Sequence, residues 1–136
     1  MIAGTFNGNP LTVAAGNALL NYLMDNRGVY ADLASKGDYL RGSFNRWAAA
    51  RGYPAAMTGL GSLFQAHLKP APISKPRHLF GQPQEALHDL QLHLRLNGLF
   101  LPWYHMAFLS TAHQNKDVEL VLQAHMNAVA TAVSPH

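Results

Sequence analysis

Residues 1–16 constrain this chain most, because they join a glycine-rich loop to a strongly signalled helix start. Gly4 and Gly8 give the backbone room to turn tightly or to approach a ligand or a neighbouring chain. Asn9 followed by Pro10 is typical of a helix N-terminus. The asparagine side chain accepts a hydrogen bond from a first-turn amide, and proline fits the first helical position. The pattern predicts a loop that ends in a capped helix at Pro10.

Thr5 lies in this loop, just ahead of the helix, and offers both a hydroxyl and a backbone amide. Unpaired amides and the helix dipole favour negative charge at a helix N-terminus, so the position suits an anion. Physical reasoning alone leaves a second interpretation open, in which the stretch is an ordinary glycine-rich loop that feeds a capped helix.

Apolar residues recur at helical spacing in four stretches of the chain. The predicted helices are one that starts at Pro10 and ends at residues 25–28, then 29–51, 84–97 and 115–133. The first is apolar on most sides, which predicts that it is buried or lies in an interface. The second is expected to bury a stripe made of Tyr30, Leu33, Gly37, Leu40, Phe44 and Trp47.

Shorter apolar runs bounded by glycine or proline predict four strands. They are residues 56–58, 62–68, 99–101 and 107–110. Four prolines between residues 69 and 83 exclude regular structure over most of that stretch and predict a long loop. This order of elements predicts an α+β fold in which a small antiparallel sheet is covered by helices.

Composition narrows the class of protein. With 136 residues the chain is one domain by length, and its 49% apolar and 12% charged residues suit a segment that covers part of its surface against another domain or subunit. The ten Lys and Arg are scattered without a run, so we expect no nucleic-acid surface. There is no cysteine and no apolar run of about 18 residues, so we expect no membrane span and a cytoplasmic protein.

Three sequence blocks match motifs that occur together in one enzyme family. Gly4-Thr5-Phe6-Asn7-Gly8-Asn9-Pro10-Leu11 with Ala14-Ala15-Gly16 resembles the GT-x-x-x-NP-x-x-x-AAG signature of the class III pyridoxal-phosphate-dependent aminotransferases, above all the glutamate-1-semialdehyde aminomutase branch. Residues 59–64 resemble the family's G-x-G-S-M-F strand motif, and residues 98–113 resemble its G-hydrophobic-x-x-P … GFLS-x-AH block. The blocks follow the family's order and cover nearly the whole chain.

The resemblance implies a cofactor role for the N-terminal loop. In the family the threonine of the first motif binds the phosphate of pyridoxal phosphate across a dimer interface, in the partner subunit's active site. Thr5 would be that ligand, with Gly4 and Phe6 as its backbone neighbours. Residues 1–28 would then form the phosphate loop and the interdomain or dimer helix, and residues 29–136 the C-terminal small domain of a fold-type I enzyme.

The resemblance also implies that most of an active site lies outside this chain. The Schiff-base lysine of the family lies in the large domain, shortly before the GT motif, and here only three residues precede Gly4. We therefore expect the C-terminal portion of such an enzyme, with no catalytic residue of its own and no activity alone. Its expected partners are the missing large domain and a second subunit, as a homodimer.

Tyr104 and His105 depart from the family's pattern. Aminomutases have an aromatic–glutamate pair there, near the substrate, and His105 in place of glutamate changes the charge and the pH response. The two residues are predicted to contact substrate, and aminotransferase rather than aminomutase specificity stays open. A second interpretation places His105 in a pocket wall or on the surface.

The eight histidines invite a metal interpretation, which their spacing does not support. His88 and His93 are five residues apart, whereas helical zinc pairs are four apart, and no carboxylate completes a set. His113 is expected to act structurally between the last strand and the final helix. Two functions therefore remain: a C-terminal aminotransferase segment, or a non-catalytic oligomerising module derived from this family.

Overall fold

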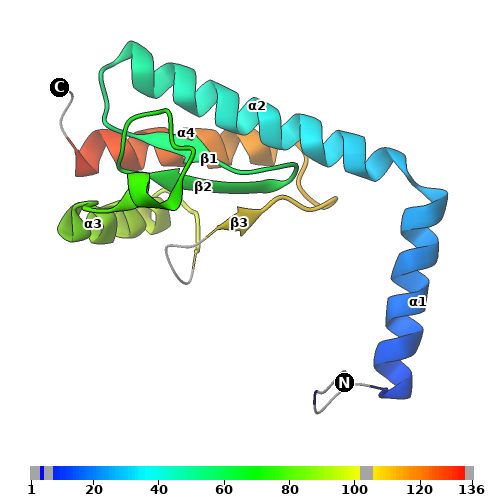
Figure 1. Ribbon diagram of the computed structural model, residues 1–136. Helices are drawn as coiled ribbons and strands as arrows, with labels where there is room; N and C mark the ends of the chain where they lie inside the picture. Colours follow the sequence, from blue (N-terminus) through cyan, green and yellow to red (C-terminus); the bar gives the residue numbers. More distant parts are fainter. Residues whose placement is uncertain (1–3, 5–7, 102–105, 134–136) are drawn as a thin grey trace. The chain divides into compact units, whose positions relative to one another are not determined.

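A computed structural model describes residues 4, 8–101 and 106–133 of the chain. Its elements, in order, are α1 (Pro10–Asp25), α2 (Gly28–Ala50), β1 (Ala56–Thr58), β2 (Leu63–His67), the 3-10 helix η1 (Pro76–Leu79), α3 (Gln84–Leu96), β3 (Ala107–Phe108) and α4 (Asn115–Ala132) (Figure 1). The chain divides into two compact units, Met1–Asp32 and Leu33–His136.

In the first unit, α1 begins where the sequence predicts. The Oδ1 atom of Asn9 accepts hydrogen bonds from the amides of Leu11, at 2.9 Å, and Thr12, at 3.4 Å, and Pro10 is the first helical residue. No residue of α1 is buried, and its apolar side chains are widely exposed, with Leu11 80% accessible. Within the described residues of its own unit, this apolar helix has no surface that buries its side chains.

The second unit is built on a three-stranded antiparallel sheet in the order β1-β2-β3. Met57 pairs with Ala66, and Phe64 pairs with Ala107. Two glycines make the turn between β1 and β2, and Gly61 has a φ of +56°, which non-glycine residues rarely adopt. The predicted strands 56–58 and 62–68 are therefore present, the second somewhat shortened.

The predicted strand at residues 99–101 is wrong, because its backbone is used to end α3. The amide of Leu99 donates to the carbonyl of Leu94 at 2.9 Å, and that of Gly98 donates to Arg95 at 3.0 Å. With Gly98 at a φ of +85°, these two bonds form a Schellman ending. The predicted strand 107–110 is reduced to the two residues of β3.

Helices cover one face of the sheet (Figure 1). Phe64 and Ala66 of β2 point into a core shared with α2, α3 and α4, where Phe44, Leu90 and Leu94 are fully buried. The predicted stripe of α2 is confirmed from Gly37 to Phe44, whereas Trp47 is half-buried. Tyr30 is 61% exposed, because it precedes the part of α2 that packs on this core.

Among the described residues, the opposite face of the sheet is buried at one end and exposed at the other. Ala56 and His67, which are paired across β1 and β2, are buried there, and the proline-rich loop passes beside β1 at residues 71–73. At the other end Leu63 pairs with Phe108, whose side chain is 62% exposed. The exposed end therefore offers an apolar surface next to β3.

Gly37 lets α2 approach the β1–β2 turn more closely than any side chain would allow. A Cβ atom at this position would lie 1.9 Å from the carbonyl oxygen of Gly61. We expect Gly37→Ala to lower the free energy of unfolding by more than about 2 kcal/mol, because backbone would have to move. Urea denaturation measures the change.

Gly42 on the same helix is the matched control. A Cβ there would meet only the end of the Arg46 side chain, at 3.3 Å. Gly42→Ala should therefore raise the free energy of unfolding by about 0.5–1 kcal/mol, since alanine favours the helix. Equal effects of the two substitutions would contradict the close approach at Gly37.

His125 makes the second unit sensitive to acid. Its ring lies edge-on between Phe44, at 6.3 Å, and Phe64, at 5.8 Å, and its Nδ1–H donates to the carbonyl of Val121 at 2.8 Å. Burial lowers the pKa of His125 from 6.5 to about 4, although the bond to Val121 opposes this shift. The folded chain therefore holds a neutral imidazole that the unfolded chain protonates below pH 6.5.

The unfolded state binds the extra proton between pH 6.5 and pH 4, so stability is complete above pH 6.5 and falls as the pH drops to 4. The expected loss is roughly 3 kcal/mol. Denaturation curves across this range should show that His125→Leu removes most of the loss, whereas the exposed control His88→Gln retains it. An unchanged acid response in His125→Leu would contradict the assignment.

Candidate functional site

The predicted site residues lie near the N-terminus and in the stretch between residues 101 and 106. Gly4 is described and exposed. Thr5 and Phe6, and likewise Tyr104 and His105, lie outside the described residues. The geometry of the site therefore comes from the segments that lead into these positions.

The first turn of α1 has no amide left for an anion. Pro10 has no N–H, the amides of Leu11 and Thr12 donate to the Asn9 side chain, and the amide of Val13 donates to the Asn9 carbonyl at 3.0 Å. The sequence suggested that these helix amides would be unpaired, but they already donate hydrogen bonds to Asn9. A phosphate ahead of α1 would gain from the helix dipole, but its hydrogen bonds would have to come from the preceding loop.

Gly8 forms the backbone turn at the end of that loop. Its φ is +79°, and a Cβ placed on it would meet no atom within 4 Å. The glycine is therefore required by the turn of the backbone and not by crowding. Two features of the described residues fit a phosphate. The chain turns sharply at Gly8, and the positive end of the α1 helix dipole follows.

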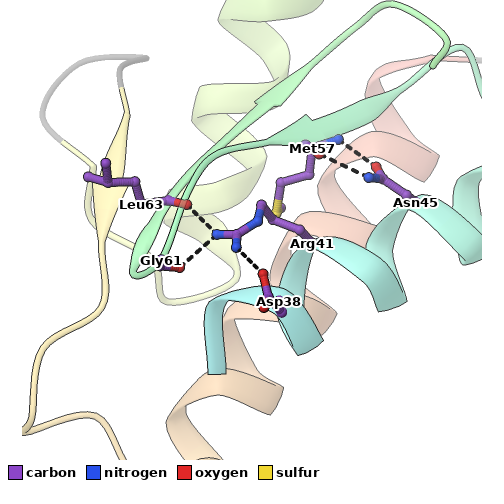
Figure 2. A network of polar contacts seen from close by, with 6 residues as sticks. All are labelled: Asp38, Arg41, Asn45, Met57, Gly61 and Leu63. Carbon is purple, nitrogen blue, oxygen red and sulfur yellow. Dashed lines mark hydrogen bonds and ion pairs between the residues drawn. The ribbon is translucent and has the colours of Figure 1, made fainter. Parts of the chain in front are cut away.

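In the second unit, Arg41 holds the β1–β2 turn against α2 (Figure 2). Its Nη1 donates to the carbonyl oxygens of Gly61, at 2.9 Å, and Leu63, at 2.5 Å, and its Nη2 bonds to Asp38. The arginine is 8% exposed, so its charge is almost fully withdrawn from water and depends on these partners. This turn belongs to residues 59–64, the second block of the sequence resemblance.

Asn45 closes the outer edge of β1 (Figure 2). Its Oδ1 accepts the Met57 amide at 2.6 Å, and its Nδ2 donates to the Met57 carbonyl at 2.9 Å. The side chain thus takes the place of a neighbouring strand and blocks edge-to-edge pairing there. Sequence reasoning missed both Arg41 and Asn45; a polar residue on a buried helix stripe is the only sequence signal that they offer.

His113 holds the turn between β3 and α4. Its Nδ1 accepts the Ser110 amide at 2.9 Å, and its carbonyl accepts a hydrogen bond from Nζ of Lys36 at 3.1 Å. The structural role predicted for His113 is confirmed by these bonds.

A shallow depression of about 360 Å³ lies beside this network. Its lining combines α2, β1 and the proline-rich loop, through Arg41, Asn45, Ala56, Met57, Thr58, Gly59, Ala71, Pro72 and Ile73. Among the described residues no group of three or more His, Cys, Asp or Glu could hold a metal ion. No helix in the same part of the chain is long and apolar enough to cross a membrane.

Comparison with known sequences identifies relatives over most of the chain. No protein-family model matches it. The glutamate-1-semialdehyde 2,1-aminomutase of Methanobrevibacter smithii is 33% identical over 124 residues, which is 90% of this chain and 29% of that enzyme. The chain therefore spans less than a third of the length of the curated relatives that it matches.

Comparison with solved structures gives the same result for the fold. An ω-transaminase from Sphaerobacter thermophilus superposes with a TM-score of 0.77 and 27% identity, over 97% of this chain and 30% of that one. A β-phenylalanine aminotransferase from Variovorax paradoxus gives 0.74 and 26%, over 91% of this chain and 29% of its own. The predicted fold, a small antiparallel sheet covered by helices as in the C-terminal domain of fold-type I enzymes, is confirmed.

The three sequence blocks and the fold indicate the same group of enzymes. The relatives found by sequence and by structure belong to that group as well. The chain resembles the class III pyridoxal-phosphate-dependent aminotransferases, and it is similar to glutamate-1-semialdehyde 2,1-aminomutases over about 90% of its own length.

Proposed function

We propose that this chain is the C-terminal portion of a pyridoxal-phosphate-dependent aminotransferase or aminomutase, and that it completes the active site of a partner subunit in a homodimer. The observation that carries the proposal is α1: an apolar helix without a buried residue, directly after the loop that bears the family's GT-x-x-x-NP pattern. A helix of this kind is stable only when another surface covers it.

Thr5 is the proposed phosphate ligand, with Gly4 and Phe6 supplying the neighbouring backbone. Because Asn9 occupies the first-turn amides of α1, the hydroxyl and amide donors of this loop would carry most of the binding. Hydrogen bonds to a charged group contribute about 1.5–3 kcal/mol each. The bound cofactor would supply the electron sink for amino-group transfer, while the loop holds its phosphate in place.

Tyr104 and His105 are proposed to line the substrate entrance. They precede Met106 and β3 in the sequence, and Phe108 of β3 is exposed. A histidine there adds positive charge as the pH falls through its titration range, so it would hold a substrate carboxylate more firmly in acid.

The remaining polypeptide of the enzyme is the proposed cover for two surfaces. One is α1, and the other is the apolar end of the sheet formed by Leu63, Met106 and Phe108. In functional terms we assign residues 1–28 to the phosphate loop and interface helix, and residues 29–136 to the small domain. Charged residues make up only 12% of the chain, in keeping with a segment that is largely covered in its assembly.

The alternative is a non-catalytic oligomerising module. The exposed apolar side chains of α1 favour it too, because a second copy could cover residues such as Leu11, Leu19 and Leu20 as well as a large domain could. The two functions differ in one property: only the enzyme segment needs Thr5.

A chimera tests the proposal, with this chain replacing the matching segment of the Methanobrevibacter smithii enzyme. We expect the chimera to retain pyridoxal phosphate and Thr5→Ala to weaken its affinity for the cofactor about tenfold or more, because a charge-assisted hydrogen bond is lost. Cofactor absorbance during titration measures the affinity. Aminomutase activity of the same samples gives a second readout.

Thr12→Ala is the matched control, since Thr12 lies in the first turn of the exposed helix and the hydrogen bond recorded for it uses its backbone amide. It should leave the cofactor affinity within about twofold of the parent value. Equal affinities of the parent chimera and the Thr5→Ala variant would reject the phosphate role and favour the oligomerising module.

A further inference from the structure

The loop between β2 and α3 has an unusual charge distribution. Residues 69–83 contain Lys69, Lys75, Arg77 and His78, whereas all seven Asp and Glu of the chain lie outside this range. The acid-free stretch runs from residue 39 to residue 84 and also holds Arg41, Arg46 and Arg51 of α2, of which Arg41 bonds to Asp38. The proposed cofactor role does not use the cations of the loop.

Two of the basic side chains of this loop face solvent, whereas Lys69 and His78 are partly buried. Lys75 and Arg77 are exposed, and neither forms an ion pair within the described residues. Phe80 follows them and is 76% exposed. Two cations without an ion pair among the described residues, and an exposed aromatic ring, thus lie within residues 75–80, which include η1.

The loop backbone is held in place although the loop is long. The amide of Leu68 donates to Oε1 of Gln82 at 2.9 Å, which ties the two ends of the loop together. Residues 76–79 form η1, and the Ser74 amide donates to Nδ1 of His78 at 3.4 Å. Prolines restrict the rest, so a partner would lose little free energy to ordering this segment.

We propose that Lys75, Arg77 and Phe80 form a docking surface for an acidic peptide segment of another protein. The arginine offers a planar fork that matches a carboxylate, and the lysine adds a second positive charge. Phe80 suits an apolar side chain between the acids of the partner. A nucleic acid fits less well, because it needs a longer track of cations and several stacking rings.

Fluorescence anisotropy on the full chain tests the proposal. The probe is a short fluorescein-labelled peptide in which glutamate alternates with leucine, compared with a labelled single-stranded oligonucleotide. We expect the peptide to bind, and binding to weaken as salt is raised, because the cations are exposed. Lys75→Glu with Arg77→Glu should weaken peptide binding about tenfold or more, and Phe80→Ala should weaken it severalfold.

Lys116→Glu, an exposed charge reversal at the start of α4, is the matched control and should change binding less than about twofold. Circular dichroism checks that each variant stays folded. The proposal is overturned if the peptide does not bind, if Lys116→Glu weakens binding as much as the loop variants do, or if the oligonucleotide binds more tightly than the peptide.

Discussion

The buried guanidinium of Arg41 is the interaction on which the second unit depends most. It joins α2 to the backbone of the β1–β2 turn, and Gly37 allows the two to come close enough for the bonds to form. A buried charge that lost these carbonyl partners would cost several kcal/mol, so the turn and the helix are held as one piece. Asn45 then fixes the outer edge of β1 in the same way, by taking both polar groups of Met57.

The two units differ in what stabilises them. The second has a core of its own, in which Phe44, Leu90 and Val129 are fully buried. The first is a capped apolar helix of 16 residues that buries none of them. Isolated helices of this length are marginal in water, so α1 needs a surface that the described chain does not supply within its own unit. The proposed function, a segment that is covered by other polypeptide of a larger enzyme, would account for this contrast.

Structural features that depend on neighbouring residues could be predicted from the sequence. Contacts between residues far apart in the sequence could not. Asn9-Pro10 predicted the start of α1 because the cap and the proline act on adjacent residues. The strand expected at residues 99–101 was wrong because the same apolar pattern also occurs where a helix ends. The hydrogen bond from Leu99 to Leu94 distinguishes the helix ending from a strand. Arg41 and Asn45 bond to backbone up to 22 residues away, for which a single sequence holds no pattern. The roles of Thr5 and His105 stay predictions, since both residues lie outside the described part of the chain.

Hydrogen exchange tests the central claim most directly, because it reports the protection of α1 and of the second unit in one experiment. The isolated chain is compared with the chimera that carries the rest of the enzyme. The account predicts that the amides of α1 exchange quickly in the isolated chain and slowly in the chimera, while α4 is protected in both. Protection of α1 in the isolated monomer equal to that in the chimera would contradict the claim that outside polypeptide stabilises this helix.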